Sequence, residues 1–144
     1  MYKLLCAIVL LHKMNISMVD ILNVASDISS PPGRTDIINY KNNLIIVDYA
    51  HTPDAMENIY NLVNDIKKGK VYTVFGCTGD RDRLKRPIMM DLATKNSDYV
   101  VLTSDDLHDE DFNRIVDDTI KECKKSNYEI IMDRGKAIEK AISL

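Results

Sequence analysis

Short apolar segments alternate with amphipathic segments through the last two thirds of this chain of 144 residues. Residues 71–75, 98–102 and 128–132 are rich in apolar and β-branched side chains, which favours strands. The segments before, between and after them, about 54–67, 76–95, 110–124 and 135–144, carry apolar residues at helical spacing, with a loop at the start of 76–95. Such alternation needs crossover connections, which place successive strands parallel and helices on both faces of the sheet. The sequence therefore predicts an α/β fold with a mainly parallel sheet.

An earlier run, LIIVDYAHTPD at residues 44–54, predicts a buried strand that ends in polar side chains. In open α/β sheets, ligands bind at the carboxyl ends of the strands. Asp48 is there either as a helix cap or turn former, or as a carboxylate that orients a hydroxyl, a base or a metal-bound water. His51 is either a structural histidine or a contact to a nucleotide or a substrate carboxylate. We expect this strand end to lie beside the loops that start at 76 and 103.

The loop at residues 76–87, GCTGDRDRLKRP, is the most informative of the three. Gly76 and Gly79 permit tight turns and close approach of the backbone to a ligand. Four cations and two carboxylates follow within seven residues, and Pro87 suits the first turn of a helix. Cations near a helix start favour phosphate or carboxylate binding, although a solvated, salt-bridged helix start explains the pattern equally well. The glycine spacing excludes a P-loop.

Charge and cysteine content exclude several classes of protein. A net charge of −3 and a pI near 5.6 are untypical of a general nucleic-acid binder. The three cysteines lack metal-ligand spacing, so we expect reduced thiols in a cytoplasmic protein, with Cys77 more plausible as a packed thiol than as a reactive one. No apolar run is long enough to span a membrane. The acidic residues of 105–111 are candidates for binding Mg²⁺ or, more simply, for capping the next helix.

The first third of the chain has a different organisation. Residues 2–13 predict a helix that is apolar nearly all round and therefore buried, and a second helix follows at 18–25. The segment SSPPGR at 29–34 breaks any helix and marks the best domain boundary. Residues 35–40 and 44–48 flank Lys-Asn-Asn and predict a β-hairpin. We expect two domains, 1–30 and 31–144.

Three motifs together resemble one family: PGR at 32–34, VDYAHTPDAM at 47–56 and GCTGDRDRLKRP at 76–87. Their order and spacing resemble the C-terminal domain of Mur ligases, nearest to the UDP-N-acetylmuramyl tripeptide synthetases (MurE type). The resemblance implies that residues 1–30 are the terminal helices of a truncated central ATPase domain. It implies that residues 31–144 are the Rossmann-like C-terminal domain, lacking its last strand.

The resemblance also implies an activity. Mur ligases use ATP and Mg²⁺ to join an amino acid to a UDP-N-acetylmuramyl peptide through an acyl phosphate, in peptidoglycan synthesis. By this resemblance Arg34, Asp48 and His51 face the nucleotide, Lys85 lies near its phosphates, and Arg81 holds the carboxylate of the incoming amino acid. The central and N-terminal domains would lie outside this chain. We therefore expect no complete catalytic set, no metal site and no ligation by these residues alone.

One segment departs from the family pattern. Where diaminopimelate-adding enzymes have Asp-Asn-Pro-Arg at the amino-acid site, this chain has Asp105, Asp106, Leu107 and His108. The amino-acid substrate is therefore open. One alternative is a non-catalytic, degenerate binding module of the same fold. Another is the corresponding domain of a folylpolyglutamate- or cyanophycin-type ligase, against which the GDRD sequence at 79–82 argues.

Overall fold

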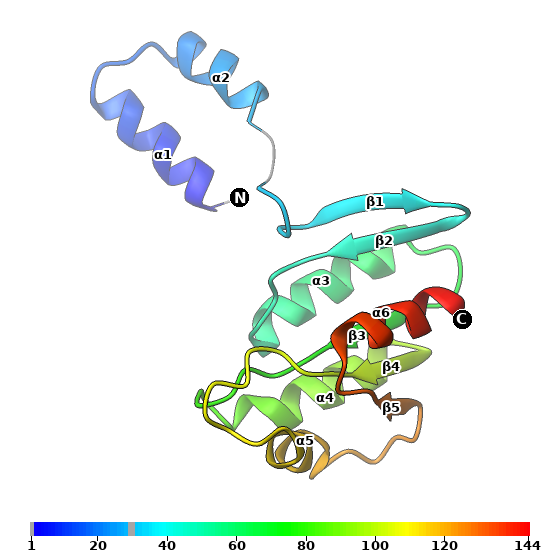
Figure 1. Ribbon diagram of the computed structural model, residues 1–144. Helices are drawn as coiled ribbons and strands as arrows, with labels where there is room; N and C mark the ends of the chain where they lie inside the picture. The colour runs from blue at the N-terminus through cyan, green and yellow to red at the C-terminus, as the bar shows by residue number, and fades with distance from the viewer. Residues whose placement is uncertain (1, 29–30) are drawn as a thin grey trace. The chain divides into compact units, whose positions relative to one another are not determined.

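The computed structural model describes residues 2–28 and 31–144 (Figure 1). The chain packs as two compact units, which divide between Asp48 and Tyr49. The break that the sequence predicts near residue 30 includes Ser29 and Ser30, which lie outside the described residues. The division into domains at 30 and 31 therefore stays a prediction.

The second unit is built on a three-stranded parallel sheet in the order β3 (Tyr72–Phe75), β4 (Tyr99–Leu102), β5 (Tyr128–Ile130). Its helices are α3 (Pro53–Ile66), α4 (Lys85–Asn96), α5 (Phe112–Ile120) and α6 (Arg134–Ser143). Helix α6 packs on β3 and β4, while α4 contacts β4 and lies between α3 and α5 (Figure 1). The predicted α/β fold with a parallel, Rossmann-like sheet is thus confirmed. Because Phe75 pairs with Leu102, and Leu102 with Ile130, the three strands end level and deliver their loops to one edge.

The core lies between the sheet and helix α4. Met89, Met90 and Ala93 of α4 are buried against β4, whose Val100 and Leu102 are at most 1% exposed. Helix α5 adds three further buried residues to the same cluster, and α3 adds two, namely Phe112, Ile115, Val116, Met56 and Tyr60. Short strands of three or four residues, rich in β-branched and aromatic side chains, suit such a covered sheet.

Each of three helices starts at a side-chain cap. Thr52 accepts a hydrogen bond from the Ala55 amide at 3.3 Å, and Pro53 occupies the first turn of α3. Asp111 caps α5 and Asp133 caps α6 in the same way. Such caps satisfy amides that the helix itself leaves unpaired. For Asp111, the expectation that an acidic residue of this segment caps the next helix is confirmed.

The first unit contains two helices and a hairpin. Helices α1 (Tyr2–Lys13) and α2 (Met18–Ser26) pack against each other, and strands β1 (Asp36–Tyr40) and β2 (Asn43–Val47) pair antiparallel. Lys41 makes the turn with a left-handed φ of 53°. These elements agree with the sequence prediction.

Two predicted burials in this unit are wrong. In the expected buried helix, Leu10 of α1 is 63% exposed, and in the expected buried strand, Val47 of β2 is 43% exposed. The reason is that, among residues 2–28 and 31–144, β2 pairs with β1 only and α1 packs chiefly on α2. Accordingly β2 is not a strand of the parallel sheet.

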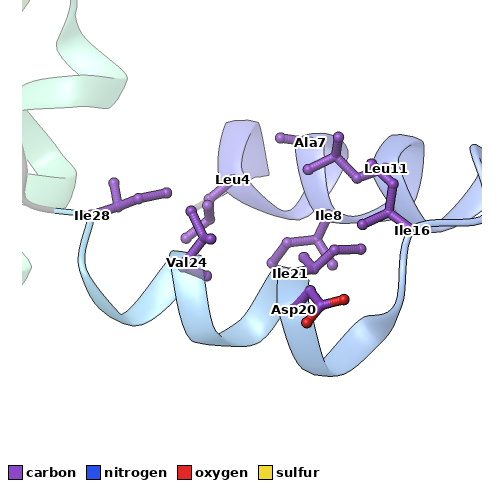
Figure 2. A pocket seen from close by; sticks show the side chains of 10 residues that line it. Leu4, Ala7, Ile8, Leu11, Ile16, Asp20, Ile21, Val24 and Ile28 are labelled. Carbon is purple, nitrogen blue, oxygen red and sulfur yellow. The ribbon is translucent and has the colours of Figure 1, made fainter.

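An apolar hollow of about 260 Å³ lies between α1 and α2 (Figure 2). Side chains such as Leu4, Ile8, Ile21 and Val24 line it, and Asp20 is the one charged residue at its border. Figure 2 shows aliphatic side chains of both helices directed toward the space between them. In the part of the chain that the structure describes, no helix has the length and apolar character needed to cross a membrane.

Shortening a core side chain of α4 should lower stability much more than shortening an exposed one. Met90→Ala removes a side chain that is fully buried, and we expect a loss of about 2–5 kcal/mol in the free energy of unfolding. Ile88→Ala on the same helix, at a side chain that is 51% exposed, should cost clearly less, about 1 kcal/mol. Urea unfolding followed by circular dichroism measures both, and equal losses would contradict the described core.

Candidate functional site

Two loops meet at the carboxyl edge of the parallel sheet, one after β3 and one after β4. The Gly79 amide donates to the Asp106 carbonyl at 2.8 Å. The Thr78 hydroxyl donates to the Asp105 carboxylate at 3.0 Å, and the Asp109 amide donates to the Asp80 carboxylate at 3.0 Å. Residues 27 to 29 positions apart in sequence are thereby held together. The two loops form one surface.

The contact between these loops requires a glycine. A Cβ atom on Gly79 would collide with the Leu107 carbonyl oxygen and lie 2.6 Å from the Leu107 carbonyl carbon. Both are backbone atoms, which cannot rotate away as a side chain can. Next to this contact Asp80 has a φ of 50°, and across it His108 has a φ of 47°, both in the left-handed region. Such conformations are unfavourable for side-chain-bearing residues and persist only where surrounding contacts hold them.

Arg86, in the first turn of α4, supplies those contacts from below. Its side chain is fully buried, and its two terminal nitrogens donate to Glu110 at 2.6 and 2.8 Å. The same nitrogens donate to the Asp118 carboxylate at 2.9 Å and to the Thr78 carbonyl at 3.2 Å. Glu110 in turn accepts the Asp80 amide at 3.0 Å. A bidentate pair of this kind is among the strong hydrogen bonds of proteins.

Sequence reasoning counted Arg86 among the loop cations and missed its role. It also placed Glu110 among carboxylates for Mg²⁺ or helix capping, whereas the structure pairs it with Arg86. The sequence feature that indicates a buried Arg86 is its place directly before Pro87, in the first turn of a helix. When such a helix covers a sheet, a residue in its first turn is buried. A charge there needs a partner.

The charges of this cluster shift one another's pKa values. Hydrogen bonding from Arg86, with help from the Asp80 amide, lowers the pKa of Glu110 to about 2. The hydrogen bond from Arg83 is the main cause that lowers the pKa of Asp118. The hydrogen bond to Glu110 raises the pKa of Arg86. All four groups are therefore charged at neutral pH, and each of the two arginines forms an ion pair with each of the two carboxylates.

Above this cluster lies a shallow depression of about 210 Å³, lined by Asp80, Arg81, His108 and Asp109. It brings together Arg81 and His108, two predicted site residues from different loops. Among the residues that the structure describes, the exposed Arg81 guanidinium makes no hydrogen bond or ion pair. It is therefore available to an anionic ligand. The His108 ring lies 3.7 Å from the Asp106 carboxylate.

Asp105 and Asp106, the other two predicted amino-acid residues, flank the depression without lining it. Asp105 accepts the Thr78 hydroxyl and lies 3.8 Å from the Arg134 guanidinium. The Asp106 carboxylate also accepts the His108 amide at 3.3 Å. Both carboxylates thus shape the loop that carries His108.

His51 and Lys85 form a second pair of predicted site residues. The Lys85 ammonium donates to the His51 carbonyl at 2.8 Å. The exposed His51 ring is bonded through Nδ1 to the Tyr49 carbonyl at 3.0 Å, and the two rings lie 4.9 Å apart. Among the described residues no hydrogen bond to Nε2 of this ring is formed, and the Lys85 ammonium lies beside the backbone of the same residue.

Arg34 and Asp48, the remaining predicted nucleotide contacts, belong to the first unit. The Asp48 carboxylate accepts the Thr35 amide at 2.7 Å and the Thr35 hydroxyl at 3.2 Å. It therefore ties the start of β1 to the end of β2. A contact from Asp48 to a nucleotide stays a prediction. Arg34 is exposed.

Cys77 is a packed thiol rather than a reactive one. It is 2% exposed, and its burial raises the pKa of the thiol. Thiolate chemistry at neutral pH is thereby disfavoured.

Within residues 2–28 and 31–144, no three His, Cys, Asp or Glu side chains gather in a way that would hold a metal ion.

The chain matches a known protein family and curated relatives over most of its length. Residues 33–144 match the model of the family described as "Mur ligase, glutamate ligase domain". The chain is 43% identical over 129 residues to the UDP-N-acetylmuramoyl-L-alanyl-D-glutamate–2,6-diaminopimelate ligase of Bacillus cereus, covering 89% of this chain and 26% of that protein. The chain thus spans about a quarter of the length of this curated relative.

Solved structures show the same relationship. A structure of a UDP-N-acetylmuramoyl-L-alanyl-D-glutamate–2,6-diaminopimelate ligase matches with a TM-score of 0.71 and 32% identity, covering 93% of this chain and 28% of the other. The folylpolyglutamate synthase of Thermotoga maritima matches with a TM-score of 0.62 at 24% identity, covering 83% and 28%. The latter likeness is one of fold alone.

The close approach at Gly79 predicts a large effect of a single methyl group. Gly79→Ala should lower the free energy of unfolding by about 1–3 kcal/mol or more, because backbone must move to admit the Cβ atom. Gly69→Ala, where a Cβ would meet nothing within 4 Å, should change stability by less than about 1 kcal/mol. Thermal and urea unfolding of both variants decide this, and a tolerated Gly79→Ala would refute the described loop contact.

The lowered pKa of Glu110 predicts an acid-dependent loss of stability. The carboxylate has an ordinary pKa of 4.5 and a folded pKa of about 2, so its contribution is complete above pH 4.5 and is lost as the pH falls toward 2. In Glu110→Gln, urea unfolding between pH 6 and 2 should show a flatter decline, with the part due to Asp118 retained. Glu122→Gln, at an exposed side chain, should keep the wild-type profile, and identical profiles for all three proteins would contradict the Glu110 assignment.

Proposed function

Because this chain belongs to the Mur ligase family through residues 33–144, we propose that it holds the incoming amino acid in an ATP-dependent, ADP-forming ligase of peptidoglycan synthesis. The observation that carries this proposal is the depression at the sheet edge. There an unpaired Arg81 and His108 come together from two loops. A guanidinium without a protein partner suits the carboxylate of an amino acid. The acidic neighbours Asp80 and Asp109 suit its ammonium group.

The amino-acid side of the site extends to Asp105 and Asp106. The printed names of the relatives specify 2,6-diaminopimelate as the added amino acid. In this chain His108 stands where that group's motif has an arginine. Diaminopimelate is therefore the first substrate to test, and the contact to its distal end is where we expect this chain to differ.

The nucleotide side of the proposal rests on four residues. Arg34, Asp48, His51 and Lys85 would contact ATP, with Lys85 nearest its phosphates. The support is the hydrogen bond from the Lys85 ammonium to the His51 carbonyl, which ties a cation to the backbone of the residue whose ring is exposed. ATP supplies the phosphoryl group that activates the peptide carboxylate. The role of these residues would be to bind and orient it.

Mg²⁺ belongs to the reaction of this family, but the described residues offer no ligand cluster for it. We therefore assign no step to the metal on this chain. The UDP-N-acetylmuramyl peptide would bind chiefly to the parts of the relatives that this chain does not match, and residues 1–30 would continue into their central domain. The proposed location is the cytoplasm, where these precursors and ATP occur together.

The alternative is a binding module that does not turn over substrate. The replacement of the usual Asp-Asn-Pro-Arg by Asp105, Asp106, Leu107 and His108 favours it. A folylpolyglutamate-type role has the fold likeness in its favour and nothing more.

A chimera tests the proposal. Residues 33–144 replace the matching part of the Bacillus cereus ligase, and ADP release is measured with ATP, UDP-N-acetylmuramoyl-L-alanyl-D-glutamate and meso-diaminopimelate. We expect turnover, and Arg81→Gln should raise the KM for diaminopimelate about 10- to 100-fold with the KM for ATP within about twofold, as expected for loss of a charged hydrogen bond.

The matched control is Arg114→Gln, at an exposed arginine on α5 outside the depression, which should leave both KM values unchanged. A folded chimera that binds diaminopimelate without releasing ADP would favour the non-catalytic module. Equal KM values for Arg81→Gln and the parent chimera would remove Arg81 from the amino-acid site.

A further inference from the structure

Two loops form the depression, and each contains a residue whose backbone conformation is unfavourable by itself. Arg81 follows Asp80, whose φ of 50° is left-handed, and His108 has a φ of 47°. The two lining residues come from connections after different strands. Their common orientation must therefore come from contacts beneath the loops.

Those contacts converge on one buried side chain. Through its two terminal nitrogens Arg86 makes four hydrogen bonds, two of them to Glu110, one to Thr78 and one to Asp118. Thr78 and Asp80 are the two neighbours of Gly79. Arg86 holds the first directly, and it holds the second through the Glu110 carboxylate, which accepts the Asp80 amide.

The same anchor reaches the second loop. The Glu110 amide donates to the Leu107 carbonyl at 3.0 Å, so the residue that Arg86 fixes also closes the turn containing His108. Asp80 donates its amide to Glu110, and its own carboxylate accepts the Asp109 amide of the second loop. One guanidinium thus connects the residues that flank Arg81 and His108.

We propose that Arg86 is a positioning residue of the amino-acid depression, acting through Glu110 to orient Arg81 and His108 without touching the ligand. The inference rests on the proposed function for the identity of the ligand, but the anchoring itself does not depend on it. A lysine cannot replace the arginine here. Its ammonium offers three donors from a single point, whereas this site uses four donors in one plane.

The test uses the full chain labelled with ¹⁵N and ¹³C, compared as wild type, Arg86→Lys and Glu110→Gln. We expect both variants to shift the amide signals of Asp80, Arg81, His108 and Asp109 and the ring signals of His108. With meso-diaminopimelate as the probe, both should bind about tenfold more weakly than wild type, equal to about 1.4 kcal/mol. Signal dispersion confirms that each variant is folded, and Glu110→Gln, which keeps the side-chain shape, decides if Arg86→Lys unfolds.

Two controls separate positioning from a general loss of stability. Lys95→Gln removes an exposed cation of α4 whose ion-pair partner is Asp91, a residue of the same helix and of neither loop. Met90→Ala destabilises the core beneath α4 without altering the anchor. Both should keep the loop signals and bind the probe within about twofold of wild type.

The outcomes separate this inference from the proposed function. Unchanged loop signals and unchanged affinity in Arg86→Lys and Glu110→Gln would overturn the positioning role. The same holds if Met90→Ala weakens binding as much as they do. If wild type binds no diaminopimelate, the amino-acid proposal fails. The loop signals alone then decide whether Arg86 orients Arg81 and His108.

Discussion

The loops at the ligand edge of this sheet depend on one buried ion pair, between Arg86 and Glu110. Removing a guanidinium from water is costly, and it is tolerated here because all four hydrogens on its terminal nitrogens are donated to oxygen atoms. Those oxygens belong to Thr78 in the loop after β3, to Glu110 in the loop after β4 and to Asp118 of α5. Because the buried charge of Arg86 needs partners from several segments, these hydrogen bonds hold the segments in fixed positions relative to one another. Exposed ion pairs such as that between Lys95 and Asp91 impose no such relation.

The arrangement explains how a small parallel sheet presents a depression at its carboxyl edge. Level strand ends bring the loops to one edge, and Gly79 lets their backbones approach. The Arg86 cluster then holds Asp80 and His108 in left-handed conformations. The depression with its unpaired Arg81 follows from these constraints. The chemistry proposed for the family member needs only that this guanidinium remain available and correctly oriented.

The secondary structure and the fold class were predictable because periodicity and capping residues are local properties. The parallel strands, the hairpin and the cap at Asp111 all follow from them. Burial of α1 and β2 was not predictable, because it depends on which surfaces pack together, and in this chain β2 pairs only with β1 among the described residues. Arg81 and His108 could be selected from loop chemistry and family resemblance. The burial of Arg86 could be inferred from its place before Pro87, but its pairing with Glu110 could not, because the two positions are 24 residues apart.

Amide hydrogen exchange at Asp80 measures directly how firmly the Arg86–Glu110 pair holds the loops, since this amide donates to the carboxylate that Arg86 holds. In an exposed loop without such an anchor, exchange would proceed at nearly the rate of an unstructured peptide. If the pair holds the loops, we expect the Asp80 amide to be protected to a degree comparable with the amides of β4, so that it exchanges only when the unit unfolds. Exchange at the unstructured rate, with β4 still protected, would contradict it.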